Sequence, residues 1–195
     1  DGLDFYYRQT ADITFPDPGD CDDLPVSCNW VPLGYEWNPD TESYDSNPFI
    51  GSYDGGGFRI SNLIIDTNAF QYAGLFGYVA DGAELKNINL ADVEITSSYS
   101  HDKYPGYVGP LAGYNEGTIQ NCTASGGIKS EIRSAVGGIV GYNTGTITGC
   151  TANCYLSGGS GSVVGGIAGY NAGTITGCTA NCYLSGGSGS VVGGI

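Results

Sequence analysis

The stretch from Gly145 to Ile167, GTITGCTANCYLSGGSGSVVGGI, returns letter for letter as Gly173 to Ile195. The same frame extends toward the N-terminus, because Cys122, Cys150 and Cys178 are evenly spaced and each begins the same local pattern. A fixed period of about 28 residues is typical of a solenoid, in which one supersecondary unit stacks on copies of itself.

The residue types within the repeat indicate strands rather than helices. The repeat is rich in Gly, Ser, Thr, Val, Ile and Tyr and contains no Lys, Glu or Met. Small or apolar residues alternate with polar ones from Cys150 to Leu156, and a period of two turns one face of a strand inward. Shorter β-type pieces lie at Thr146–Thr148 and Val163–Ala168. We therefore predict an all-β solenoid with about three strands and about 28 residues per coil.

The N-terminal third lacks the strict period but contains β-type pieces between Pro- and Asp-rich loops. These pieces are Phe5–Phe15, Asn29–Gly34 and Phe49–Ile65. We predict one solenoid domain over residues 1–195, with irregular coils in 1–72 and repeat coils in 73–195, the last of them incomplete. The repeat before Gly113 is longer than the others, which predicts an inserted loop around residues 97–106.

Several segments resemble a known family. AGLFGY (73–78), VGGIVGYNTGTITGC (136–150) and VGGIAGYNAGTITGC (164–178) are similar to the GLUG motif, and the upstream ADI, NWVPLG and GSYDGGGFRISNLII pieces resemble the segment that commonly precedes it. The family occurs in large secreted bacterial surface proteins, including adhesin-like proteins and non-catalytic regions of immunoglobulin-A peptidases. The resemblance implies a right-handed parallel β-helix at a bacterial surface or outside the cell. Cys154 and Cys182 depart from the commoner pattern.

The distribution of charge bears on partners. The net charge is −14, most of the acidic residues lie in residues 1–66, and residues 134–195 contain no charged side chain. Such an acidic chain is not expected to bind nucleic acid. The sequence contains no run of about 18 apolar residues, so we predict no membrane span in it. The neutral surface suits surface glycans, host proteins or another copy of the chain. Tandem duplication of a charge-free unit would produce the same composition without any partner.

Seven cysteines allow several arrangements. In stacked coils, Cys122, Cys150 and Cys178 would form one column, and Cys154 and Cys182 a second, with Cα atoms about 4.8 Å apart. That spacing permits a disulfide between Cys154 and Cys182, and the alternative is that all five are reduced and buried. Cys21 and Cys28 lie in an acidic loop, where we expect a disulfide if the protein is secreted.

The sequence offers little for catalysis. His101 is the one histidine, so neither a histidine zinc site nor a facial triad can form. The carboxylates of the repeat coils do not recur at one position, and we expect no enzymatic activity. A Ca²⁺ site is the one cofactor that the sequence suggests, because hard oxygen ligands cluster in a single loop. The candidate ligands are Asp17, Asp20, Asp22 and Asp23.

Three sets of repeated side chains are predicted to stack as columns. Tyr114, Tyr142 and Tyr170 form one aromatic set, and Asn115, Asn143 and Asn171 form an amide set beside it. We interpret both as structural, and a carbohydrate-binding module is the alternative if Tyr and Asn line a groove. Thr146, Thr148, Thr174 and Thr176 would form a small outward array of the kind that ice-binding solenoids use.

The last repeat stops at Ile195 without a polar capping segment. Open coil ends or neighbouring repeats are therefore predicted to self-associate. The function that we predict is a non-catalytic extracellular structural or adhesive module, a stiff stalk or fibre segment of a bacterial surface protein. A carbohydrate-binding module is the first alternative, and an ice-binding solenoid or a polysaccharide-active enzyme is less favoured.

Overall fold

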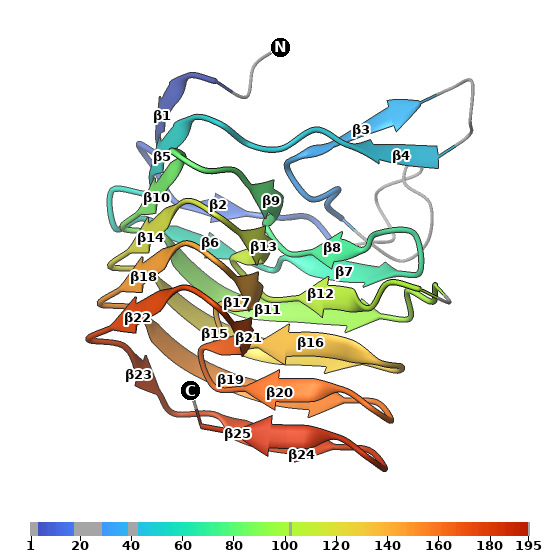
Figure 1. Cartoon of the computed structure of the whole chain (residues 1–195). Helices are drawn as coiled ribbons and strands as arrows, with labels where there is room; N and C mark the ends of the chain where they lie inside the picture. The colour runs from blue at the N-terminus through green and yellow to red at the C-terminus, as the bar shows by residue number, and fades with distance from the viewer. Residues whose placement is uncertain (1–3, 18–28, 39–42, 102, 195) are drawn as a thin grey trace.

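The computed structural model describes residues 4–17, 29–38, 43–101 and 103–194. Within these residues the regular elements are β-strands, and nearly all of them pair in parallel with the strand one coil before or after (Figure 1). The prediction of an all-β fold with stacked parallel strands is confirmed. The chain winds from the N-terminus at one end of the stack toward the C-terminus at the other.

Two sheets run through the whole described chain. Sheet I contains, in order, β1 (Tyr6–Arg8), β5 (Ser52–Asp54), β10 (Glu84–Lys86), β14 (Thr118–Gln120), β18 (Thr146–Thr148) and β22 (Thr174–Thr176). Sheet II contains β2 (Ile13–Thr14), β6 (Arg59–Ser61), β11 (Asn89–Ser97), β15 (Thr123–Ser130), β19 (Thr151–Gly158) and β23 (Thr179–Ala180), with β7 (Ile64–Thr67) paired to β11 and β24 (Tyr183–Gly186) paired to β19. The irregular N-terminal coils and the repeats therefore share the same sheets.

Two shorter sheets close the opposite side of each coil. Sheet III contains β8 (Tyr72–Ala73), β12 (Gly106–Val108), β16 (Ser134–Gly137), β20 (Val163–Gly165) and β25 (Val191–Gly193). Sheet IV contains β9 (Phe76–Val79), β13 (Ala112–Asn115), β17 (Val140–Asn143) and β21 (Ala168–Asn171). One antiparallel hairpin, β3 (Tyr35–Asn38) with β4 (Ser43–Ser46), projects from the N-terminal end of the stack (Figure 1).

Each repeat coil has four strands, which corrects the expected three. The piece predicted at Val163–Ala168 is divided between β20 and β21, because the chain turns at paired glycines between them. A Cβ atom on Gly138, at the equivalent turn one coil earlier, would lie 2.2 Å from the carbonyl oxygen of Gly166 and 2.7 Å from the Cβ of Ala152. Backbone packs against backbone there, and glycine alone fits.

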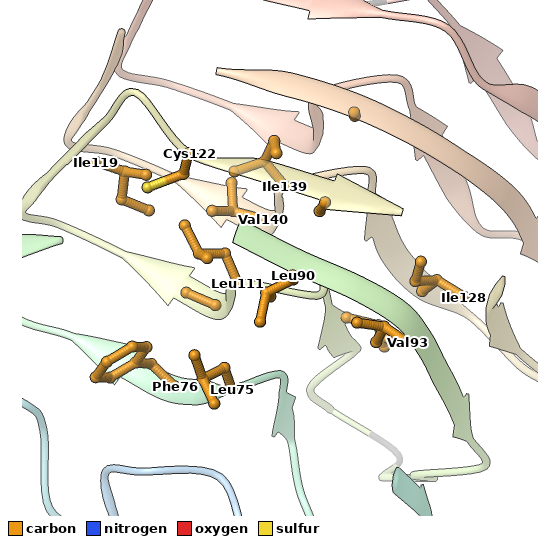
Figure 2. Packing of buried hydrophobic residues seen from close by; sticks show 14 of the residues in the cluster. Leu75, Phe76, Leu90, Val93, Leu111, Ile119, Cys122, Ile128, Ile139 and Val140 are labelled. Atoms are coloured by element: carbon orange, nitrogen blue, oxygen red, sulfur yellow. The ribbon is translucent and has the colours of Figure 1, made fainter. Parts of the chain in front are cut away.

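The core is a set of columns in register. Leu85 pairs with Ile119 and Ile119 with Ile147 in sheet I, and all three are fully buried. Figure 2 shows side chains from successive coils filling the space between the sheets, with Leu75 and Phe76 next to Leu111, followed by Ile119 and Cys122. The coils thus share one continuous apolar interior.

The N-terminal coils fill this interior with aromatic rings instead of small side chains. Phe49 and Phe76 are buried, and their ring centroids lie 5.0 Å apart. Phe15 packs on Trp30 with centroids 5.0 Å apart, and the indole N–H of Trp30 donates to the carbonyl oxygen of Leu75. Larger side chains explain why this part of the chain lacks the repeat letters yet continues the same sheets.

The corner between sheets I and II has a left-handed backbone in each coil from β10 onward. Asn87 and Asn121 have φ of 53° and 54° at this corner, and Gly149 and Gly177 have φ of 64° and 61° in the next two coils. Asn and Gly are the residues that adopt this conformation at least cost.

The loop expected around residues 97–106 lies between β11, which ends at Ser97, and β12.

Candidate binding surfaces

The asparagine column lies inside the stack. Asn115 and Asn143 are fully buried at the ends of β13 and β17. The Nδ2 of Asn115 donates to Oδ1 of Asn143 at 2.8 Å, and the Nδ2 of Asn143 donates to Oδ1 of Asn171 at the same distance. Each of the three amides also donates to the backbone carbonyl oxygen two residues further along the chain. The column therefore holds a corner of the solenoid together and is not available to a ligand.

At its N-terminal end, the asparagine column leaves one buried hydrogen-bond acceptor unpaired within the described part of the chain. Asn115 pairs in register with Val79, which has no amide to donate. The Oδ1 atom of Asn115 is accordingly buried without a hydrogen-bond partner among the described residues. An unmet buried acceptor costs about 1–3 kcal/mol, so the remaining bonds of the amide column must offset this penalty.

The tyrosine column lies beside the amides and is partly open to solvent. The Tyr114 and Tyr142 rings stack at 5.0 Å and 7°, and the Tyr142 and Tyr170 rings at 4.7 Å and 15°. Tyr78 meets Tyr114 edge to face at 4.9 Å. Because most ring faces are covered by the next ring, the column presents mainly its edges and hydroxyl groups, and Tyr170 is 49% exposed.

A second row of tyrosines, absent from the sequence-based prediction, widens this aromatic surface. Tyr72 of β8 and Tyr107 of β12 stack at 5.7 Å and 7°, and Tyr107 also contacts Tyr114 and Tyr142. Two hollows of about 330 and 310 Å³ adjoin these rings. The first is lined by Gln71, Tyr72, Tyr78, Tyr104, Tyr107 and Tyr114, and the second by Pro105, Tyr107, Arg133, Ser134, Ala135, Tyr142, Gly161, Val163 and Tyr170.

Glu116 is the carboxylate nearest this surface. The Tyr78 hydroxyl donates to Glu116 Oε2 at 2.6 Å, and the Tyr114 hydroxyl donates to Oε1 at 3.5 Å. Burial raises the pKa of Tyr78, and the hydrogen bond to Glu116 raises it further. The carboxylate is thus bound to the column itself, and the Tyr and Asn side chains do not line one common groove.

The two cysteine columns hold free thiols. The backbone N–H of Cys122 donates to the sulfur of Cys150 at 3.4 Å, and that of Cys150 donates to the sulfur of Cys178 at 3.3 Å. Both Cys122 and Cys150 are fully buried. These thiols pack as small apolar side chains, and each lies one coil from the next.

A bridge between Cys154 and Cys182, which the sequence allowed, is not formed in the structure. The sulfur of Cys182 accepts a hydrogen bond from the backbone N–H of Cys154 at 3.4 Å. The Cys154 sulfur lies within hydrogen-bond distance of the carbonyl oxygens of Ala124 and Gly138. A hydrogen bond between the thiols lowers the pKa of Cys182, the more exposed partner, to about 7 and raises that of Cys154.

The proposed calcium ligands are mostly outside the described residues. Asp20, Asp22 and Asp23 lie there, as do Cys21 and Cys28 with their expected disulfide. Asp17 is exposed, and its carboxylate accepts a hydrogen bond from Asn62 Nδ2 at 3.1 Å. Across the described ranges, no three His, Cys, Asp or Glu side chains are grouped so as to hold a metal ion.

The threonine array spans two coils. Thr148 and Thr176 face outward with their hydroxyls 3.3 Å apart. In the preceding coils Gln120 occupies the same row and donates to Glu84, which also binds Lys86. The regular hydroxyl surface is therefore interrupted by Gln120 on β14 and by the charged side chains of β10. His101 is exposed in the loop before β12, where its Nδ1 accepts from the Lys103 amide.

Comparisons with known proteins agree with the motif found in the sequence. Residues 104–129 and 133–158 match the model of the GLUG motif, which confirms the resemblance in two adjacent coils. Halomucin from Haloquadratum walsbyi is 34% identical over 128 residues, which are 65% of this chain and 1% of that protein. A putative Gly-rich membrane protein from Evansella cellulosilytica is 32% identical over 122 residues, 62% of this chain and 12% of that protein.

The chain thus corresponds to a small part of each of these longer relatives. No solved structure matches it. In the part of the chain that the structure describes, no helix has the length and apolar character needed to cross a membrane.

Replacing Asn143 by Ala is expected to destabilise the chain by about 1–3 kcal/mol. The change removes the acceptor of Asn115 Nδ2 in a buried position and also the donor to the Gly145 carbonyl oxygen. Urea unfolding followed by circular dichroism measures the loss. Asn171→Ala is the matched comparison: it removes the acceptor of Asn143 Nδ2, but Asn171 is exposed, so water can replace that acceptor and the loss should be smaller. Equal stability losses for the two variants would contradict a buried amide column.

The thiol of Cys182 is expected to be alkylated half-maximally near pH 7. The thiolate is the reactive form, and the pKa of Cys182 is lowered to about 7 by the Cys154 thiol. Iodoacetamide labelling of the native protein across pH 5–9, compared with Cys182→Ser, isolates this residue. Cys154→Ala, which removes the donor, should move the half-maximal pH upward, toward the ordinary value for cysteine. An unchanged pH profile in that variant would rule out the thiol pair as the cause.

Proposed function

We propose that this chain, which carries two adjacent GLUG motifs, is a non-catalytic segment of an extracellular or cell-surface protein and serves there as a stiff stalk. In this proposal the stacked sheets form a right-handed parallel β-helix with about 28 residues per coil. The structural role is favoured over an adhesive one, because the strongest observations concern the interior of the stack.

The observation that carries the proposal is the continuity of sheets I and II from the first described strands to the last. Sheet I connects β1 to β22 without a break, and sheet II connects β2 to β23. Every coil is hydrogen-bonded to its neighbours, and the buried columns cross the same boundaries. A solenoid of this kind bends little between coils, which suits a spacer that holds other segments away from a surface.

The relatives support a place at the cell surface. Both are much longer than this chain, which agrees with a segment that is one part of a large protein. One of them is called a Gly-rich membrane protein. The neutral outer surface of residues 134–195 would tolerate contact with surface glycans, host proteins or further coils of the same kind.

Two carboxylates of the coils, Glu84 and Glu116, support a non-catalytic role. Glu84 binds Ser52, Lys86 and Gln120, and Glu116 binds two tyrosine hydroxyls. A hydrogen bond from Lys86 lowers the pKa of Glu84, so this carboxylate stays ionised near neutrality. Groups engaged in this way hold neighbouring coils together and are poorly suited to exchange protons with a substrate.

Antibodies raised against the chain are expected to label intact cells of the organism that produces it. Immunogold electron microscopy of unpermeabilised cells measures this, and brief protease treatment of the intact cells should remove the label. An antibody to a ribosomal protein provides the control for cell integrity. Labelling that requires permeabilised cells would contradict the proposed location.

A further inference from the structure

A separate hollow of about 430 Å³ lies on the outer face of sheet II. It opens over β15, which lies between β11 and β19; the three strands are side by side in Figure 1. Glu94 pairs in register with Gly127, and Gly127 pairs with Tyr155. The row therefore reads carboxylate, glycine, tyrosine, and the missing side chain at Gly127 leaves a gap that we call the Gly127 slot.

The slot has the width of one ring. Glu94 and Tyr155 lie on strands two spacings apart, which is about 9.6 Å. A ring placed midway would lie about 4.8 Å from each flanking strand, so the side chains that form the walls can lean in to contact it. The next outward row, Thr96, Lys129 and Ser157, runs along one side of the slot and is also in register. The volume falls within the range of about 300–1,000 Å³ that is typical of small-ligand sites.

The walls of the slot differ in chemistry. Tyr155 is 72% exposed, and on the side toward β15 it has no aromatic neighbour, because Gly127 stands where Tyr155 and Tyr183 stand in the next two coils. Tyr183 lies on its other side, with ring centroids 6.4 Å apart and a tilt of 46°. Tyr155 therefore offers an aromatic surface to the slot, unlike the stacked rings of the tyrosine column.

The opposite wall and the rim are polar. Among the described residues nothing hydrogen-bonds the Glu94 carboxylate or the side-chain hydroxyls of Thr96 and Ser157. The Nζ of Lys129 donates to Glu131 at 3.0 Å, so its charge is already paired. The slot thus combines one aromatic wall with a free acceptor opposite and hydroxyls at the side.

We propose that the Gly127 slot binds one neutral hexopyranose ring of a glycan. Such a ring has an apolar C–H face to cover Tyr155 and several hydroxyls to donate to Glu94 and to pair with Thr96 and Ser157. A planar aromatic ligand would leave Glu94 without a partner, and an acidic sugar would be repelled by it. The inference goes beyond the stalk proposed above and does not rest on it, because the slot binds sugar wherever the chain is located.

Saturation-transfer NMR tests the proposal with three probes, the methyl glycosides of β-glucopyranose, β-galactopyranose and α-mannopyranose. We expect at least one of them to bind the 195-residue chain with a Kd of about 1–10 mM. Methyl β-glucopyranosiduronate, which carries a carboxylate, is the charged counterpart and should bind about tenfold more weakly or not at all.

Gly127→Tyr is the decisive variant. Nothing lies within 4 Å of a Cβ atom placed on Gly127, and its φ is outside the left-handed region, so the chain should fold and the new ring should continue the row of Tyr155 and Tyr183. Its unchanged far-ultraviolet circular dichroism and melting temperature would verify folding. The ring fills the slot, so binding should fall at least about tenfold. Tyr155→Ala should give the same loss by removing the aromatic wall.

Tyr170→Ala is the matched control, since Tyr170 lies in the tyrosine column on sheet IV and should leave binding unchanged. Binding that persists in folded Gly127→Tyr would overturn the proposal, as would the absence of binding of all three neutral glycosides to the unmodified chain. Binding lost in Tyr170→Ala and kept in Gly127→Tyr would also overturn it and assign the sugar to the hollows of the tyrosine column. None of these outcomes depends on cell-surface labelling.

Discussion

The in-register pairing of each coil with the next is the interaction on which the rest of the structure depends. Parallel strands place equivalent residues about 4.8 Å apart, so every inward side chain meets its own counterpart. That geometry makes a buried amide acceptable at Asn143, because the same amide above and below supplies the missing partners. It also stacks the tyrosine rings face to face and aligns the cysteine sulfurs with backbone N–H groups of the neighbouring coil.

Much of this could be predicted from the repeat alone. Residues that recur every coil, such as Tyr142 and Asn143, must lie in columns once the strands are parallel, and the alternation around Cys154 places its side chain inside. The fourth strand of each coil was missed, because its boundary depends on contacts that Gly138 makes with a residue one full coil away. Likewise, spacing permits a disulfide between Cys154 and Cys182, and the orientation that leaves both thiols free is not encoded in spacing.

The proposed sugar site illustrates a different limit of sequence reasoning. Repeated letters reveal the interior, where each coil must match its neighbours, whereas the Gly127 slot exists because one coil departs from the pattern. The sequence does mark Gly127 as unusual, because Tyr155 and Tyr183 occupy the equivalent position of the next two coils. The structure adds that Glu94 lies in register with Gly127 on the other side of the gap. In a solenoid, sites of this kind arise where an outward side chain is missing, while the columns inside supply the rigidity that holds their walls apart.

The claim of in-register stacking is tested most directly by nuclear Overhauser effects in isotopically labelled protein. Ile119 and Ile147 are suited to it, because they pair in register on β14 and β18 and because Ile119 lies outside the duplicated stretch, in the distinct segment Gly117–Cys122. The structure predicts cross-peaks between the backbone protons of these two residues, 28 positions apart. Parallel pairing also brings Thr146 and Thr148 close to Ile119, one on each side of Ile147. Cross-peaks from Ile119 that centre on a residue other than Ile147, or the absence of contacts between the two strands, would contradict it.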